Sequence, residues 1–162
     1  MKQTLKLLVA GSLLLATAAA HAEVFVQFIK PETYRDVPFS PVDREKLMKD
    51  IEKHFVELGK NLPEGTDLYI DVLDVDLAGR LIPARGASED IRLLGAGGDW
   101  PRMALHYSVE ADGKILQRGD VQLKDMDYQA RGNKVTGTKP LRFERQMIDD
   151  WYYKTIAPRK RG

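Results

Sequence analysis

Leu68-Tyr-Ile-Asp-Val-Leu-Asp-Val-Asp-Leu77 is the stretch that decides the fold. Apolar and polar residues alternate through it, which is typical of a strand with one buried side. The alternation changes phase in the middle, because the apolar residues fall on even positions up to Val72 and on odd positions from Leu73 onward. This change of phase predicts a β-bulge, or a strand that changes partner.

Further elements are predicted on both sides of this strand. Apolar residues at three- and four-residue spacing indicate a helix that Ser40 caps and Pro41 begins. Asp112-Gly113 readily takes the positive φ angles of a tight turn and joins two strands into a hairpin. The predicted order is a strand at 23–29, a helix at 41–60, strands at 68–77, 102–110 and 114–126, and a helix at 140–156.

This order predicts an α+β fold, with a mixed, mainly antiparallel sheet of about four strands and two helices packed on one face. The opposite face of the sheet is too polar to form a second core. It is therefore either exposed to solvent or covered by a partner. The residues expected on it include Gln27, Asp71, His106, Ser108, Gln122 and Lys124.

The first 22 residues carry the features of a cleavable signal peptide. Lys2 and Lys6 precede an apolar run at 7–20 that is shorter than the roughly 20 residues of a membrane-spanning helix. Ala20-His21-Ala22 fits the specificity of signal peptidase. We therefore expect cleavage after Ala22, export to the periplasm, and a single α+β domain at 23–162. An uncleaved N-terminal anchor is the alternative.

The composition of the chain excludes several classes of partner and anchor. Removal of residues 1–22 takes away two of the 25 basic side chains and none of the 24 acidic ones, which leaves a nearly neutral protein. Such a balance does not favour binding to nucleic acid or to anionic lipid. The chain has no cysteine, so it has neither a lipid attachment site nor a disulfide, and its stability must come from a hydrophobic core.

Asp71, Asp74 and Asp76 place three carboxylates on the central strand, with Asp74 and Asp76 expected on the same side. Paired carboxylates can hold a hard cation such as calcium or magnesium. Calcium loops, however, are usually turns that contain glycine, whereas valine separates the acids here. We therefore prefer hydrogen bonds or salt bridges from these acids to nearby arginines. A metal-binding protein or a metal-assisted hydrolase remains the alternative.

The segment at 78–100 is longer than most connections in a compact domain, and segments of that length are usually functional or disordered. Its 95–98 stretch is rich in glycine but lacks the lysine and the serine or threonine of a phosphate-binding loop. Ser88 and Gly95 are suited to begin and end one or two helical turns at 88–94.

Asp99-Trp-Pro-Arg102 follows these glycines and is the candidate contact surface for a partner. Tryptophan and arginine contribute much of the binding energy when they are buried at interfaces. Together with Asp74 and Asp76, we take Asp99, Trp100 and Arg102 as candidate partner-binding residues. The alternative is that Trp100 closes one end of the core while Asp99 and Arg102 form a pair.

Enzyme motifs are poorly represented in this sequence. His54 and His106 do not have the spacing of a zinc site, and Ser108 with His106 lacks an evident orienting acid and oxyanion hole. No Gly-x-Ser-x-Gly motif is present. We therefore expect no cofactor and lean against an enzymatic role.

The segments at 73–79, 90–94, 98–102 and 141–151 together resemble a bacterial exported family known as domain of unknown function 3016. Asp-Val-Asp-Leu-Ala-Gly, at 74–79, and Asp-Trp-Pro, at 99–101, carry the resemblance most specifically. It implies an envelope location in Gram-negative bacteria and assigns no activity. The leading hypothesis is a non-catalytic binding or accessory module that meets an envelope protein or cell-wall component. Besides the metal-dependent alternative, a structural or stress-related envelope protein without a specific ligand is a further possibility.

Overall fold

The structure is a computed structural model that describes residues 22–82, 91–95, 97–130, 132 and 141–157. Residues 1–21 of the predicted signal peptide lie outside the described part. Within that part, no helix is long and apolar enough to span a membrane. The elements in chain order are β1 (Val24–Phe28), the short 3-10 helix η1 (Pro31–Thr33), α1 (Pro41–Gly59), β2 (Thr66–Asp76), β3 (Arg80–Ile82), β4 (Ile91–Leu93), β5 (Arg102–Ala111), β6 (Lys114–Lys124) and α2 (Arg142–Thr155).

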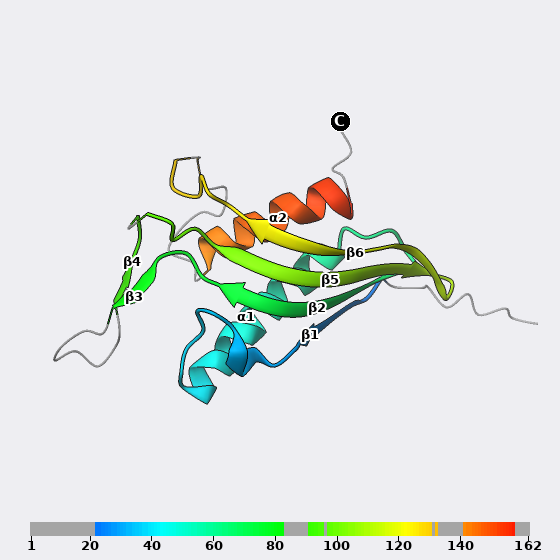
Figure 1. The fold of residues 1–162 in the computed structure, drawn as a ribbon. Helices are drawn as coiled ribbons and strands as arrows, with labels where there is room; N and C mark the ends of the chain where they lie inside the picture. The colour runs from blue at the N-terminus through cyan, green and yellow to red at the C-terminus, as the bar shows by residue number, and fades with distance from the viewer. Residues whose placement is uncertain (1–21, 83–90, 96, 131, 133–140, 158–162) are drawn as a thin grey trace, which may run out of the picture.

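The main sheet has the strand order β1-β2-β5-β6. β1 and β2 are parallel, because α1 carries the chain back to the start of the sheet between them, and the other neighbouring pairs are antiparallel. Both helices lie behind the same face of this sheet (Figure 1). The predicted α+β fold, with a mixed, mainly antiparallel sheet of four strands and two helices, is confirmed.

The hydrophobic core lies between this face of the sheet and the two helices. Phe55 of α1 and Tyr152 of α2 are fully buried, and the core-facing residues of β2 and β5 are buried as well. The indole ring of Trp151 makes edge-on contacts with Phe55 and Tyr107, at ring-centre distances of 6.3 and 5.4 Å. Trp151 therefore joins both helices to the sheet.

A β-bulge interrupts β2, as the change of phase in its sequence predicted. The register with β5 shifts between Val72 and Asp74, so that Leu73 is the extra residue. At the bulge the carbonyl oxygen of Val72 accepts two hydrogen bonds, from the hydroxyl of Tyr34 at 2.6 Å and from the N–H of Ile29 at 2.9 Å. The bulge keeps Val75 in the core while Asp74 and Asp76 turn away from it.

The segment that joins β2 to β5 differs from its prediction. β3 and β4 pair as an antiparallel ribbon that projects from one end of the main sheet (Figure 1). The prediction of helical turns at 88–94 is wrong at 91–93, which form β4, and residues 88–90 lie outside the described part. Strands of three residues are too short for an alternation of polar and apolar residues to distinguish them from a helical turn.

The opposite face of the main sheet is open within the described part of the chain. Gln27, Asp71, His106 and Asp120 form one row across its four strands. The predicted residues of this face are exposed or half-buried, while their neighbours along β2 and β5 are buried. The rings of Phe25 and Tyr69 stack next to this row, with their centres 4.8 Å apart. The face is therefore a mixed polar and aromatic surface.

Candidate functional site

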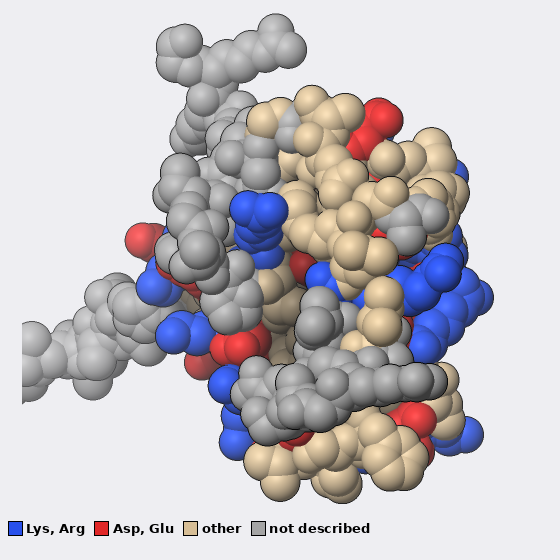
Figure 2. Space-filling model, turned by 90° about the vertical axis from the view of Figure 1, so that its left-hand side faces the viewer, with Lys and Arg blue, Asp and Glu red and all other residues tan. Residues whose placement is uncertain are grey.

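A cavity of about 440 Å³ lies where β2 ends, between the β3–β4 ribbon and the N-terminus of α2. Its apolar walls are Leu77, Ala78, Leu94, Leu141 and Phe143. Among the described residues, three charged side chains also line it: Arg92, Arg142 and Glu144. The end of the molecule that carries the ribbon presents both basic and acidic side chains among uncharged ones (Figure 2).

Glu144 is the most deeply buried charged group in this lining, at 4 % exposed. It lies in the first turn of α2, where the positive end of the helix dipole favours a carboxylate. Its Oε1 accepts a hydrogen bond of 2.7 Å from the backbone N–H of Ala78. Burial raises the pKa of Glu144, although this hydrogen bond and the nearby charge of Arg92 act in the opposite direction. The carboxylate thus ties α2 to the end of β2.

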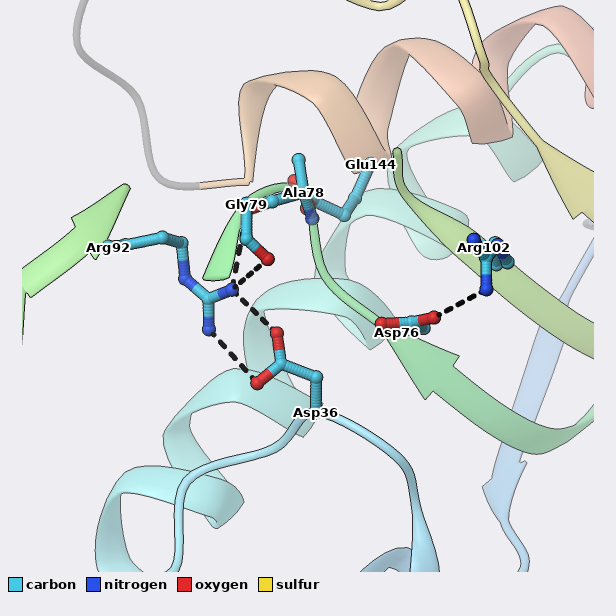
Figure 3. A network of polar contacts seen from close by, with 7 residues as sticks. All are labelled: Asp36, Asp76, Ala78, Gly79, Arg92, Arg102 and Glu144. Carbon is cyan, nitrogen blue, oxygen red and sulfur yellow. Dashed lines mark hydrogen bonds and ion pairs between the residues drawn. The ribbon is translucent and has the colours of Figure 1, made fainter. Parts of the chain in front are cut away.

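Arg92 of β4 faces Glu144 across the end of β2 (Figure 3). Its guanidinium group donates to both carboxylate oxygens of Asp36, at 2.6 and 3.4 Å, and to the carbonyl oxygens of Ala78 and Gly79, at 3.3 and 3.5 Å. Asp36 belongs to the loop before α1, and its N–H donates to the carbonyl oxygen of Val75. Arg92 therefore fastens the ribbon to the body of the protein.

A second ion pair lies beside this network. Arg102 of β5 bonds to Asp76 of β2 at 3.2 Å, and its guanidinium group lies 4.8 Å from the centre of the Trp100 ring. Burial raises the pKa of Asp76, and the charge of Arg102 opposes that rise. Asp74 pairs with Arg35 at 3.2 Å. Both carboxylates thus bond to arginines, which is the role that we preferred from the sequence.

The metal-binding alternative gains no support from this geometry. Within the described residues, no group of three or more histidine, aspartate or glutamate side chains is arranged to hold a metal ion. Asp71 lies on the open face of the sheet, in register with His106, and the Oδ atoms of Asp74 and Asp76 face arginines.

Asp99 and Trp100 connect the ribbon to the rest of the site. The carboxylate of Asp99 accepts from the N–H of Gly95 at 2.7 Å, and its carbonyl oxygen accepts from the N–H of Gly79 at 2.8 Å. Trp100 is half-buried and packs against the small apolar cluster of Ala78, Tyr128 and Phe143. Because Ala78 and Phe143 also line the cavity, the sequence-predicted tryptophan supports the cavity wall from behind.

The structure brings some of the residues predicted from the sequence together beside the cavity and separates Asp74 from them. Trp100, Arg102 and Asp76 form one contact group beside the cavity, and Asp74 lies on the same strand but pairs with Arg35. Glu144, Arg92 and Asp36 were not predicted from the sequence as members of the site. A signal for Glu144 was present, because it is the one acidic residue among the apolar and amphipathic positions of the stripe that α2 turns to the core.

His106 and Ser108, the candidate pair in the sequence, lie on the open face of the sheet. Nδ1 of His106 lies 2.9 Å from Oδ1 of Asp120, so an acid does accompany this histidine. The hydroxyl of Ser108, however, donates to Oε1 of Glu110 at 3.0 Å. The serine is therefore directed along its own strand and is not activated by the histidine, as a nucleophile would have to be.

Replacing Glu144 with glutamine is expected to stabilise the protein at pH 7. Glutamine keeps an oxygen that accepts from Ala78 and removes a charge that is costly to bury. The raised pKa means that folded Glu144 binds a proton more readily than the unfolded chain does. Its destabilising effect is therefore absent below the ordinary glutamate value of 4.5, grows as the pH rises from there to the folded pKa, and is complete above it.

The difference in unfolding free energy between Glu144→Gln and the wild type should accordingly shrink from pH 7 towards pH 4.5, as measured by urea denaturation. Glu57→Gln, at an exposed position of α1, is the matched control and should stay within about 0.5 kcal/mol of the wild type. A Glu144→Gln protein that is less stable than the wild type at pH 7 would contradict this account of the buried carboxylate.

Fold and site together define a class: a small α+β protein with a partly apolar, partly charged cavity at one end of its sheet, beside a projecting ribbon. The chain belongs to the family described as "Protein of unknown function (DUF3016)", whose model matches residues 22–154. This confirms the family that the sequence motifs resembled. Neither the curated proteins nor the solved structures include a match to the chain.

Proposed function

We propose that this protein is a non-catalytic binding or accessory module of the bacterial cell envelope, located in the periplasm, and that its partner is an envelope protein or a cell-wall component. The observation that carries the proposal is the cavity at the ribbon end of the sheet. Its volume, about 440 Å³, lies within the range of ligand sites, and its walls combine apolar side chains with a few charged ones.

The contacts of the charged groups favour binding over catalysis. Arg92 is bonded to Asp36, Arg102 to Asp76, and the carboxylate of Glu144 to a backbone N–H. Groups held in this way fix the shape of a cavity and its wall. A general base or nucleophile would instead need an orienting partner and a reacting atom within hydrogen-bond reach.

The candidate partner surface extends from the cavity to the neighbouring residues of β2 and β5. Asp99 and Trp100 form the connection behind the cavity wall, and Arg102 with Asp76 presents a half-buried ion pair beside it. Asp74 lies further along the same strand. A partner that enters the cavity would meet this surface at its rim, where charged pairs set orientation more than affinity.

Filling the cavity should abolish partner capture without unfolding the protein. Leu94 is half-buried in the cavity wall, so a tryptophan at this position can occupy the cavity. We expect Leu94→Trp to recover at least tenfold less partner than the wild type in a crosslinked capture from the envelope of the native host, quantified by mass spectrometry.

The matched control is Leu73→Trp, which places the same side chain at the exposed bulge of β2. It should capture as much partner as the wild type, and both variants should melt cooperatively. Equal capture by the wild type and both variants would show that the binding surface lies outside the cavity. Absence of any stoichiometric partner would favour an envelope protein without a specific ligand.

A further inference from the structure

The cavity lining includes one acidic group, Glu144, that forms no ion pair among the described residues. Among the described residues, no lysine or arginine forms an ion pair with Glu144, and its one hydrogen bond to another residue comes from the N–H of Ala78. A carboxylate at 4 % exposure is costly to keep charged without a cationic partner. A cation bound beside Glu144 would therefore offset part of this cost.

The two basic side chains in the described part of the lining already have partners. Arg92 makes a two-oxygen contact with Asp36, which neutralises it. Arg142 lies over the ring of Phe143, with its guanidinium carbon 4.5 Å from the ring centre. An anionic ligand would have to displace Asp36 from Arg92 and would be repelled by Glu144. A cationic ligand leaves the contact between Arg92 and Asp36 intact and is attracted by Glu144, against the repulsion of Arg142.

The remaining walls favour an aliphatic ligand. Leu77, Leu94, Leu141 and Phe143 line the same cavity as Glu144 with apolar side chains. A ligand that fits must therefore carry its positive charge at the end of a hydrocarbon chain, so that methylene groups cover the apolar walls while the head reaches the carboxylate. Bare metal ions and strongly hydrated cations do not offer that apolar portion.

We propose that the cavity binds an aliphatic primary ammonium group, which donates a charge-assisted hydrogen bond to the carboxylate of Glu144 while its hydrocarbon stem packs against the leucine and phenylalanine walls. The group can come from a lysine side chain of a partner protein or from a free amine. This inference rests on the proposed function, because it specifies the chemistry of the same cavity.

The first test compares an amine with an alcohol of similar length. In titrations of the isotope-labelled protein followed by NMR, n-pentylamine should shift the amide resonance of Ala78 saturably, with a dissociation constant on the order of 1–10 mM, as befits so small a ligand. 1-Pentanol at equal concentration should bind at least tenfold more weakly. Equal binding of the two compounds, or binding of pentanoate in preference to both, would overturn the proposal.

The second test removes the charge and keeps the shape. Glu144→Gln retains an acceptor for the N–H of Ala78 and should weaken pentylamine binding at least tenfold while leaving pentanol binding unchanged. Undiminished amine binding by this variant would overturn the assignment of Glu144. The comparison of amine with alcohol uses the wild-type protein alone, so the proposal stays testable even if the variant folds poorly.

A third arm distinguishes the sources of the ammonium group. Lysine blocked as its Nα-acetyl methylamide should bind at least as tightly as pentylamine if a lysine side chain is the natural occupant, and at least tenfold more weakly if a free amine is. Failure of every amine, together with partner capture that depends on Leu94, would refute this inference and leave the proposed function intact. Amine binding without partner capture would refute the proposed function and leave the assignment of the ammonium site intact.

Discussion

Replacing Trp151 with alanine is expected to lower the free energy of unfolding by about 3–5 kcal/mol, the usual loss for a large aromatic side chain removed from a core. Trp151 is 6 % exposed and contacts Phe55 of α1 and Tyr107 of β5. Its loss therefore opens a cavity at the point where both helices meet the sheet. Urea denaturation measures the effect, with the dependence of the unfolding free energy on urea concentration held equal for all variants.

Two further variants show whether packing is the cause. Nε1 of Trp151 is buried and has no hydrogen-bond partner within the described residues, so Trp151→Phe should lose less than half as much stability as Trp151→Ala. Phe39 is 99 % exposed, and Phe39→Ala should change stability by less than about 0.5 kcal/mol. A loss below about 1 kcal/mol for Trp151→Ala would be incompatible with the described core.

Gly79→Ala is expected to produce the second-largest effect and to act on the ribbon. Gly79 has a φ of +91°, and an added Cβ would lie 2.7 Å from the carbonyl oxygen of Leu93 and 2.7 Å from a methyl carbon of Leu94. The strained backbone alone costs about 1–3 kcal/mol. Because the carbonyl oxygen is a backbone atom, β4 must also move away from β3.

Gly113→Ala separates these two contributions. Gly113 has a φ of +69° in the β5–β6 turn, and a Cβ there would meet nothing within 4 Å. This control should cost about 1–2 kcal/mol through the backbone angle alone. Gly79→Ala should exceed it and should accelerate hydrogen exchange in β3 and β4. Unchanged exchange in the ribbon would show that Gly79 is not needed for close approach of the strands.

The fold was largely predictable because its signals are local. The phase change at Val72 and Leu73 located the bulge, Ser40 and Pro41 marked the start of α1, and Asp112-Gly113 marked the hairpin. The ribbon was not predictable, because Arg80–Ile82 and Ile91–Leu93 are short and their pairing depends on contacts between distant segments. The left-handed Leu141 before α2 carries no capping signal either.

The candidate site was predictable only in part, for a related reason. Trp100, Arg102 and Asp76 stand out by residue type, and the structure places them together. Arg92 and Asp36 are far apart in the sequence, and only the folded chain brings the guanidinium group onto the carboxylate. Glu144 is an ordinary residue of a first helical turn until the end of β2 is packed against it.

Site-specific photo-crosslinking tests the central claim, that the cavity is the partner-binding surface, most directly. A benzophenone amino acid would be placed at Arg142, an exposed residue of the cavity lining, or at Gln122 on the open face of the sheet, and each protein irradiated in the envelope of the native host. The account predicts a defined adduct from position 142 and none from position 122. An adduct from position 122 alone would contradict it and assign binding to the open face.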